Sequence, residues 1–281
     1  MNNDFFTTTD GTKIFITNRQ PAGAPKAVVL VVHGYGEHCG RYKHVMQALV
    51  EAGYAAYALD HEGHGQSDGL RAFIKDFDRP VTHMKEYLDR IKPQHPGKPV
   101  FVLGHSMGAL ISLAFTLRYQ TEIAGLLISG APVNADANVS PLMIQLGYVL
   151  NRIVPTLPLM PSTGNDVLST DPQVVIDFNN DPLNYKANMR VGLGVALNET
   201  AKKVRAQLAN LTLPLLVMHG AEDQLVNPSG SQLTYERASS KDKTLKLYPG
   251  MRHEIMNERE KATVLREIIA WLDSHVGWGP L

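Results

Sequence analysis

The sequence lacks the usual features of a secreted or membrane-embedded protein. It contains one cysteine, Cys39, so it cannot form an internal disulfide bond, and small secreted scaffolds rely on cysteine pairs. Residues Met1–Asp4 lack the basic segment and the apolar stretch that together make a signal peptide. No apolar run is long enough to cross a bilayer. These absences predict a cytoplasmic protein and leave peripheral contact with lipid open.

The charge balance and the missing motifs argue against several ligands. Basic and acidic residues number 27 each, and no long basic run exists, so we expect no nucleic-acid partner. Neither G-x-G-x-x-G nor G-x-x-x-x-G-K-[ST] is present, which argues against a nucleotide. His61 and His64 lie in a glycine-rich loop, without the i, i+4 register of a zinc-binding helix. We therefore expect no metal and no cofactor.

Strands and helices alternate along most of the chain. Hydrophobic residues make up 44% of it, which suits a globular core. A hairpin is expected over residues 5–19 around Asp10-Gly11, and the continuous apolar run Ala27–Val32 is typical of a strand buried on both faces. Further strands are expected at 54–59, 100–103, 123–129, 215–218 and 244–248, and helices at 41–52, 80–92, 107–119, 228–239 and 258–275. This order predicts an α/β fold, a mostly parallel sheet flanked by helices.

Residues 131–205 interrupt the alternation. Their prolines separate amphipathic segments, one of which has apolar residues at helical spacing: Leu142, Met143, Leu146, Val149, Leu150 and Ile153. We predict a mainly helical cap at 131–205, inserted into a core formed by 1–130 and 206–281. The apolar segments between 142 and 159 suit an aliphatic tunnel. They also suit a membrane surface, or simple coverage of the sheet.

A G-x-S-x-G motif marks the candidate nucleophile. Gly104-His105-Ser106-Met107-Gly108 follows an expected strand and opens an expected helix, which is the context that the motif requires. The serine then lies on a sharp turn, and the helix N-terminus behind it favours developing negative charge. We expect Ser106 to be the nucleophile of an α/β-hydrolase. The alternative is an ordinary glycine-rich turn.

A nucleophilic serine needs a histidine base and a carboxylate that orients the base. In this fold their order is Ser, acid, His, each just past a strand. Asp223 follows the strand ending at Met218, and His253 follows the strand ending at Tyr248. We predict Asp223 as the acid, with Glu222 as its competitor, and His253 as the base. The weaker candidates for the base are His38, His61, His64 and His219.

Two backbone N–H groups are expected to stabilise the oxyanion. One should come from Met107, the residue after the nucleophile. The other should come from the loop His33-Gly34-Tyr35-Gly36 after an early strand, and we choose Tyr35. The alternative for this loop is a flexible glycine turn.

With these residues placed, the chain resembles the monoacylglycerol lipase and lysophospholipase group of α/β-hydrolases over nearly its whole length. The segments that carry the resemblance are His33–His38, Gly40–Tyr42, Asp60–Gly69, Gly104–Gly108, Asn180–Leu183, and Tyr248–Gly250 leading to His253-Glu254. In the resemblance, the triad falls on Ser106, Asp223 and His253, and the oxyanion donors fall on Tyr35 and Met107. The implied fold is the α/β-hydrolase fold with a cap.

The resemblance also implies a reaction and its substrate contacts. The reaction is hydrolysis of a fatty-acyl ester by an acyl-enzyme mechanism, with a small lipid ester, foremost monoacylglycerol, as substrate. The implied substrate contacts are Glu37, Arg41, His105 and Phe178. For Glu37 and Arg41 the alternative is an ion pair away from the substrate.

Four positions depart from known members of this group. Cys39 replaces a common serine, and Tyr35 is bulkier than the usual residue, although only its backbone matters for the oxyanion. Phe178 replaces a tyrosine of the mammalian enzyme, and Met256 replaces a second histidine there. The last two changes remove polar groups near the glycerol, so other head groups stay open.

Four alternatives remain beside monoacylglycerol hydrolysis. They are a lysophospholipase, a broad short- or medium-chain carboxylesterase, a peptidase, and a non-catalytic lipid-binding protein that keeps the fold. Transient membrane contact through the cap is compatible with each. The sequence does not indicate an oligomeric state.

Overall fold

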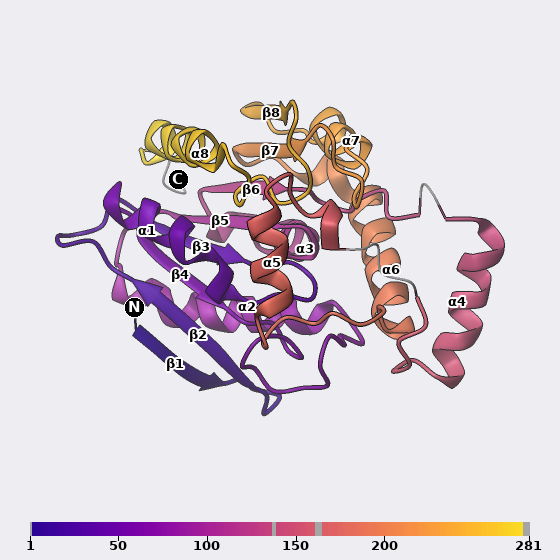
Figure 1. The fold of residues 1–281 in the computed structure, drawn as a ribbon. Helices are drawn as coiled ribbons and strands as arrows, with labels where there is room; N and C mark the ends of the chain where they lie inside the picture. Colours follow the sequence, from indigo (N-terminus) through magenta and orange to yellow (C-terminus); the bar gives the residue numbers. More distant parts are fainter. Residues whose placement is uncertain (1, 137–138, 161–164, 278–281) are drawn as a thin grey trace.

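The computed structural model describes residues 2–136, 139–160 and 165–277, which form a layered α/β structure (Figure 1). Residue 1, residues 137–138 and 161–164 of the predicted cap, and residues 278–281 of the predicted core lie outside the described residues. The strands are β1 (Asn2–Thr7), β2 (Lys13–Arg19), β3 (Val28–Val32), β4 (Ala55–Leu59), β5 (Val100–His105), β6 (Gly125–Ser129), β7 (Leu215–Gly220) and β8 (Lys243–Tyr248). The helices are α1 (Lys43–Glu51), α2 (Asp78–Ile91), α3 (Met107–Tyr119), α4 (Pro141–Ile153), α5 (Pro172–Asn180), α6 (Val191–Gln207), α7 (Ser229–Arg237) and α8 (Lys261–His275).

The strands form one sheet in the order β1-β2-β4-β3-β5-β6-β7-β8. Strand β2 runs antiparallel to β1 and β4, and the pairs from β4 to β8 are parallel. The expected hairpin is confirmed: β1 pairs with β2, and Gly11 in the connecting turn has a φ of 86°. Strands β3 to β7 are buried along their whole lengths, which explains their continuous apolar sequences.

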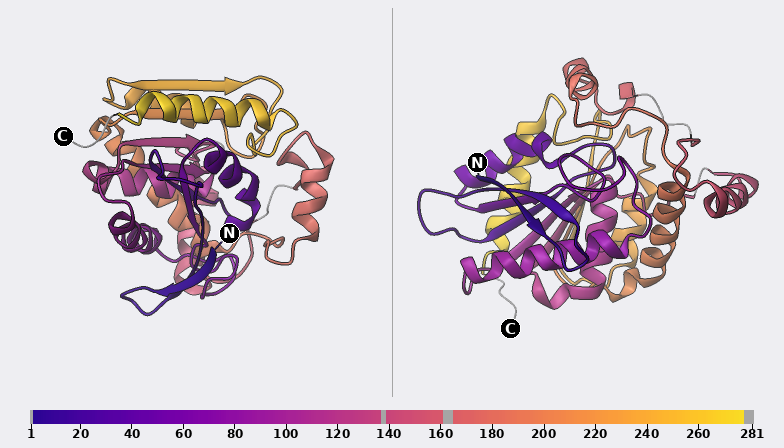
Figure 2. Two further views of the ribbon diagram at one scale, coloured as in Figure 1. Left: turned by 90° about the vertical axis from the view of Figure 1, so that its left-hand side faces the viewer. Right: turned by 90° about the horizontal axis from the view of Figure 1, so that it is seen from below.

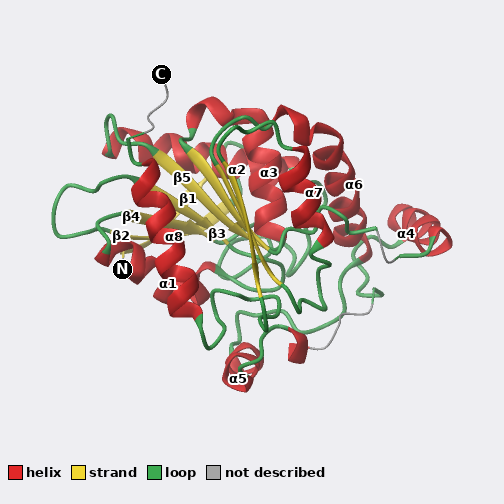
Figure 3. Ribbon diagram, turned by 90° about the horizontal axis from the view of Figure 1, so that it is seen from above, coloured by secondary structure: helices red, strands yellow, loops and turns green. Residues whose placement is uncertain are grey.

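Helices cover both faces of the sheet, as the alternation predicts. Helices α1 and α8 pack on one face, and α2, α3, α6 and α7 pack on the other (Figures 1 and 3). Each face has its own apolar core, because side chains of a doubly covered strand alternate between the two sides. The parallel arrangement brings the carboxyl ends of β3, β5, β6, β7 and β8 to one edge, where ligands bind in such sheets.

The first helix departs from its expected form. In place of one helix over 41–52, a 3₁₀ turn over Cys39–Tyr42 precedes α1. Cys39 in this turn is buried, and its N–H donates to Asp60 Oδ1 at 2.8 Å. Burial, followed by the charge of Asp60, raises the pKa of the Cys39 thiol well above its ordinary value. This cysteine is therefore an unreactive core residue.

Helices α4, α5 and α6 lie between β6 and β7. The first two lie within the segment 131–205 predicted to be a cap, and α6 continues two residues past its end. Helix α4 stands out from the rest of the molecule and packs on α6 (Figures 2 and 3). Ser140 caps it and Pro141 occupies its first turn, as is usual at helix starts. The division into core and cap stays a prediction. None of the described helices has both the length and the apolar character needed to cross a bilayer.

Candidate active site

Strand β5 and helix α3 hold Ser106 on the turn between them. Ser106 has a φ of 54° and a ψ of −123°, a conformation that residues with a side chain seldom adopt. Its N–H donates to Ser129 O on β6 at 2.8 Å, and its carbonyl accepts from Ala109 N–H at 2.9 Å. The neighbouring elements thus maintain a strained turn that places the Ser106 Oγ at the N-terminus of α3.

The two motif glycines are required because backbones pass close to them. A Cβ at Gly104 would lie 2.5 Å from Ser112 Oγ and 2.7 Å from Gly108 O. A Cβ at Gly108 would lie 2.3 Å from the carbonyl oxygens of both Val32 and His33. Glycine at these positions lets α3 contact β5 and the end of β3 directly, which brings the nucleophile beside the loop after β3.

The structure brings the three predicted triad residues into hydrogen-bond contact. The Oγ of Ser106 lies 2.8 Å from Nε2 of His253, and Nδ1 of His253 lies 2.7 Å from Oδ2 of Asp223. Asp223 follows β7 and His253 follows β8. Asp223 is buried whereas its competitor Glu222 is exposed. The serine, the imidazole and the carboxylate form the chain that general-base activation needs.

A second histidine, His219, holds the carboxylate of Asp223 from behind. The Oδ2 of Asp223 accepts from Nε2 of His219 at 2.9 Å as well as from His253, and its Oδ1 accepts two backbone N–H groups of the following turn. The Nδ1 of His219 accepts from the Ser231 hydroxyl at 2.7 Å. His219 was expected only as a weaker candidate for the base, and the structure places it behind the acid instead. Its signal is the i, i+4 spacing to Asp223.

The electrostatics of the pair fix which nitrogen of His253 carries the proton. Burial raises the pKa of Asp223, but the charge of His253 and the hydrogen bonds from His219 and His253 lower it more, so it lies well below its ordinary value. Burial lowers the pKa of His253, and the charge of Asp223 outweighs this and raises it above the ordinary value of about 6.5. An ionised Asp223 accepts Nδ1–H, which leaves Nε2 to accept the serine proton.

The weaker histidine candidates lie elsewhere. His33, His61 and His64 form a buried cluster with ring centroids 4.4 to 6.4 Å apart. Burial lowers the pKa of His61 to about 3 and that of His64 to about 4. His38 Nε2 lies 2.9 Å from Asp181. The rings of His33, His61 and His64 therefore stay neutral at working pH, and none of the four histidines contacts Ser106.

Both predicted oxyanion donors border the cavity beside Ser106. Tyr35 and Met107 line it, and within the described ranges neither backbone N–H has a hydrogen-bond acceptor. A Cβ at Gly34 would lie 3.1 Å from the Cβ of Ser106, so the loop after β3 directly faces the nucleophile. His33 fixes this loop: its Nδ1–H donates to Gly34 O, and its Nε2 accepts from the N–H of His61. Two unpaired donors in residues that line one cavity with the serine suit an oxyanion.

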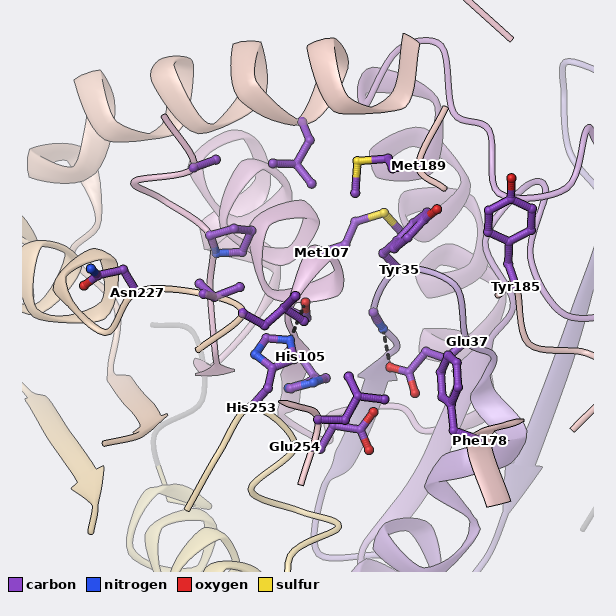
Figure 4. A pocket seen from close by; sticks show the side chains of 18 of the residues that line it. Tyr35, Glu37, His105, Met107, Phe178, Tyr185, Met189, Asn227, His253 and Glu254 are labelled. Carbon is purple, nitrogen blue, oxygen red and sulfur yellow. Dashed lines mark hydrogen bonds between the residues drawn. The ribbon is translucent and has the colours of Figure 1, made fainter. Parts of the chain in front are cut away.

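The cavity beside Ser106 has a volume of about 360 Å³, within the range of small-molecule sites. Its apolar lining includes Pro132, Ala135, Val139, Leu168, Met189, Leu197, Leu225 and Val226. Asn134, Lys186 and Asn227 also line it. The two carboxylates of the lining, Glu37 and Glu254, lie together beside Phe178, apart from Met189 and Asn227 (Figure 4). The cavity therefore has an apolar region and an acidic region around one nucleophile.

Three of the four predicted substrate contacts line the cavity. These are Glu37, His105 and Phe178, whereas Arg41 is not among the lining residues. The guanidinium of Arg41 lies over the Phe178 ring, 5.0 Å from its centroid, and is bound to carboxylates. The His105 ring packs 4.8 Å from that of His253, and burial lowers the pKa of His105 to about 3. The role of these four residues in substrate binding stays a prediction.

The expectation of an aliphatic tunnel at residues 142–159 does not fit the structure. None of the described residues in that range lines the cavity. Leu142 is 77% exposed and Ile153 is 71% exposed, because α4 packs only one side on α6 and turns these residues outward. They do not cover the sheet either. Contact of this segment with a membrane surface stays a prediction.

The described residues hold no cluster of three or more His, Cys, Asp or Glu that would suit a metal ion. Acyl transfer by a serine, a histidine and a carboxylate needs no metal or cofactor. The arrangement can activate a hydroxyl, stabilise an oxyanion and protonate a leaving group with its own residues.

Comparison with known proteins agrees with this geometry. The family model described as "Serine aminopeptidase, S33" matches residues 23–260. The chain belongs to this family. A monoacylglycerol lipase of Mycolicibacterium smegmatis is 38% identical over 266 residues, 95% of each chain, and the human monoglyceride lipase is 36% identical over 94% of this chain and 88% of its own.

Solved structures of this family have the same architecture. The crystal structure of Paleococcus ferrophilus monoacylglycerol lipase superposes with a TM-score of 0.84 at 28% identity, covering 93% of this chain and 99% of its own. The predicted α/β-hydrolase fold and the resemblance to monoacylglycerol lipases are thereby confirmed. The family and these relatives make the protein a serine hydrolase of carboxylic esters.

Proposed function

We propose that this protein hydrolyses monoacylglycerol to glycerol and a free fatty acid, with Ser106, His253 and Asp223 as its triad. The observation that carries the proposal is the contact chain from Ser106 Oγ to His253 to Asp223, at a cavity that has both an apolar and an acidic region. The relatives described above are named as monoacylglycerol or monoglyceride lipases, so their names indicate substrates of this kind. The geometry supplies a means for that reaction.

The proposed reaction has two halves. His253 Nε2 takes the proton of Ser106 Oγ as the oxygen attacks the ester carbonyl, and the N–H groups of Tyr35 and Met107 stabilise the resulting oxyanion. His253 then protonates the leaving glycerol oxygen, which leaves an acyl-enzyme. A water molecule repeats the attack, and collapse of the second intermediate releases the fatty acid and restores Ser106.

We assign the two regions of the cavity to the two parts of the substrate. The apolar side chains take the acyl chain, because each buried methylene contributes about 0.8 kcal/mol. The carboxylates of Glu37 and Glu254 can accept hydrogen bonds from glycerol hydroxyls, with Phe178 beside them. Arg41 acts on this region through the two carboxylates, not by direct contact.

A substrate panel tests the proposal. We expect 1-oleoylglycerol to be cleaved with a kcat/KM at least about tenfold above those for lysophosphatidylcholine and p-nitrophenyl butyrate. Glu37 and Glu254 share the one cation of Arg41, so their surplus negative charge disfavours a phosphate, and a butyryl chain buries little apolar surface. Released fatty acid and p-nitrophenol report the rates. A preference for lysophosphatidylcholine or for short esters would replace the monoacylglycerol assignment, and an aminoacyl anilide in the same panel tests peptidase activity.

We further propose that α4 brings the enzyme to a lipid surface. Its exposed apolar residues form a patch on one helix at the outside of the molecule: Leu142, Met143, Leu146, Val149 and Ile153. Such patches mark contacts with membranes or partners, and the proposed substrate dissolves in lipid. The patch belongs to the segment between β6 and β7, which also contributes Val139, Leu168 and Met189 to the lining of the cavity.

Polar substitutions on α4 test this contact. The double variant Leu142→Ser with Ile153→Ser should bind phosphatidylcholine vesicles at least about tenfold more weakly, since two exposed apolar side chains are removed. Its rate on soluble p-nitrophenyl butyrate should match the wild type. Leu247→Ser, at an exposed apolar position on β8, is the matched control. Equal vesicle binding by all three proteins would refute the contact.

A further inference from the structure

Glu254, the residue after the candidate base, belongs to a buried chain of charges. Arg41 donates to both carboxylate oxygens of Glu254 at 2.7 Å and to Glu37 Oε2 at 2.6 Å. Each of the three side chains is at most 10% exposed. Burial lowers the pKa of Arg41, but its attraction to Glu254 and Glu37 raises it above the ordinary value, so the cation is permanent. Two carboxylates and one guanidinium leave one surplus negative charge.

This chain of charges connects two loops of the site. At one end, Glu37 Oε1 accepts the N–H of Gly34 and the hydroxyl of Tyr42, each at 2.7 Å, which fixes the loop that carries the Tyr35 N–H. At the other end, Glu254 directly follows His253 in the chain. Residues more than 200 positions apart are therefore joined by a bidentate charge-assisted pair, the strongest kind of side-chain hydrogen bonding.

We propose that Arg41 and Glu254 are positioning residues of the ester hydrolase. Their ion pair holds the loop of the base against the loop of the oxyanion donors, and the surplus negative charge of the chain favours the imidazolium that forms in each half-reaction. The inference rests on the proposed function, because it assigns roles within that site. The buried cation of Arg41 is thereby matched by two anions that both serve the reaction.

Among the ionisable groups of the site, His253 is the one whose protonation should set the acidic limit of activity. The ionisable groups that act on it or lie next to it are Asp223, His105, Glu37, Glu254, Arg41 and Arg252. The pKa of Asp223 lies well below its ordinary value, and burial lowers the pKa of His105 to about 3. The guanidinium of Arg252 donates to the carbonyls of Asp166 and Ser169. The acidic limb of the kcat/KM profile therefore reports the pKa of His253.

The charge is tested by Glu254→Gln, which keeps the shape of the side chain. The pKa of His253 is raised in the native enzyme, so activity is present above it and is lost as pH falls through it. Removing one negative charge should move the acidic limb down by about 0.5 to 1 pH unit. The plateau kcat should fall by the same factor, about 3- to 10-fold, because the imidazolium loses that stabilisation. Glu260→Gln, at an exposed acidic position six residues on, should change neither.

The ion pair is tested by Arg41→Lys, which keeps the charge but loses the two-pronged contact. We expect kcat to fall by about tenfold or more while the acidic limb stays in place, since mispositioned donors act on the transition state at every pH. Glu254→Asp should leave the limb near its wild-type position. Thermal unfolding of each variant, followed by circular dichroism, shows that the fold persists.

Two outcomes would overturn the inference. One is an unmoved acidic limb in Glu254→Gln, which would leave Glu254 without an electrostatic role. The other is a rise in KM with unchanged kcat in both variants, which would show that the pair does not act on the transition state. All rates are measured with p-nitrophenyl butyrate, so failure of the wild type to cleave monoacylglycerol would refute the proposed substrate and leave this test intact.

Discussion

Ser106→Ala is expected to lower kcat on every ester by about a millionfold, the loss typical when a serine nucleophile is removed. The Oγ lies 2.8 Å from the base and no second hydroxyl occupies that position in the contact chain. Alanine fits the same turn, so the melting temperature should stay within a few degrees. Hydrolysis of p-nitrophenyl butyrate and labelling by a fluorophosphonate probe, read by mass spectrometry, measure the effect.

Ser112→Ala is the control for this variant. Ser112 lies on the next turns of α3, is buried, and donates to Gly108 O at 2.7 Å, away from the contact chain. The Ser112→Ala protein should react with the fluorophosphonate probe and hydrolyse p-nitrophenyl butyrate at the wild-type rate. Covalent labelling of the Ser106→Ala protein at another residue, with turnover retained, would contradict the assignment of the nucleophile. Binding of substrate without labelling of the wild type would favour a non-catalytic lipid-binding protein.

Asp223→Asn is expected to lower kcat by about 10⁴-fold, the size of effect that removal of this charge has in serine hydrolases. The Oδ2 of Asp223 accepts from two histidines, His253 at 2.7 Å and His219 at 2.9 Å. An amide NH₂ group at that position would donate to His253 Nδ1, so the imidazole would adopt the tautomer in which Nδ1 is the acceptor. The proton would then lie on Nε2, which could no longer accept from the serine. Single-turnover rates of acylation measure the loss.

Glu222→Gln is the matched control, because it removes the same charge one residue earlier from an exposed position. It should keep wild-type kcat and KM. Equal losses in the two variants, or a larger loss in Glu222→Gln, would show that the acid had been assigned to the wrong residue. Exogenous formate offers a further check, since it can restore a carboxylate only where the site has lost one.

Local patterns were sufficient to predict much of the fold and the contact chain. Strands buried in a parallel sheet have continuous apolar sequences, which makes them easy to predict. The two glycines of the motif around Ser106 indicated close backbone packing, and the structure has it at Gly104 and Gly108. The order of nucleophile, acid and base along the chain follows from the topology, because each lies at the carboxyl end of a strand. Such features depend on residues that are close in sequence, or on the general rule that active-site residues follow the carboxyl ends of parallel strands.

The supporting residues could not be predicted in the same way. Glu254 and Arg41 are bound to each other across 213 positions, and no local pattern encodes that distance. The outward direction of α4 also depends on its partner: the apolar stripe was evident, but whether it faces a cavity, the sheet or solvent depends on how α6 is placed. Pairings of this kind are properties of the assembled fold.

The burial of Cys39 makes this chain a convenient host for site-specific labels. The sequence has no other cysteine, and this one is 1% exposed and resists ionisation, so maleimide reagents should ignore the native protein. A cysteine introduced at Leu146 on α4 would be the sole reactive thiol. A spin probe or an environment-sensitive fluorophore attached there would report, without any background substitution, how deeply that helix enters a bilayer.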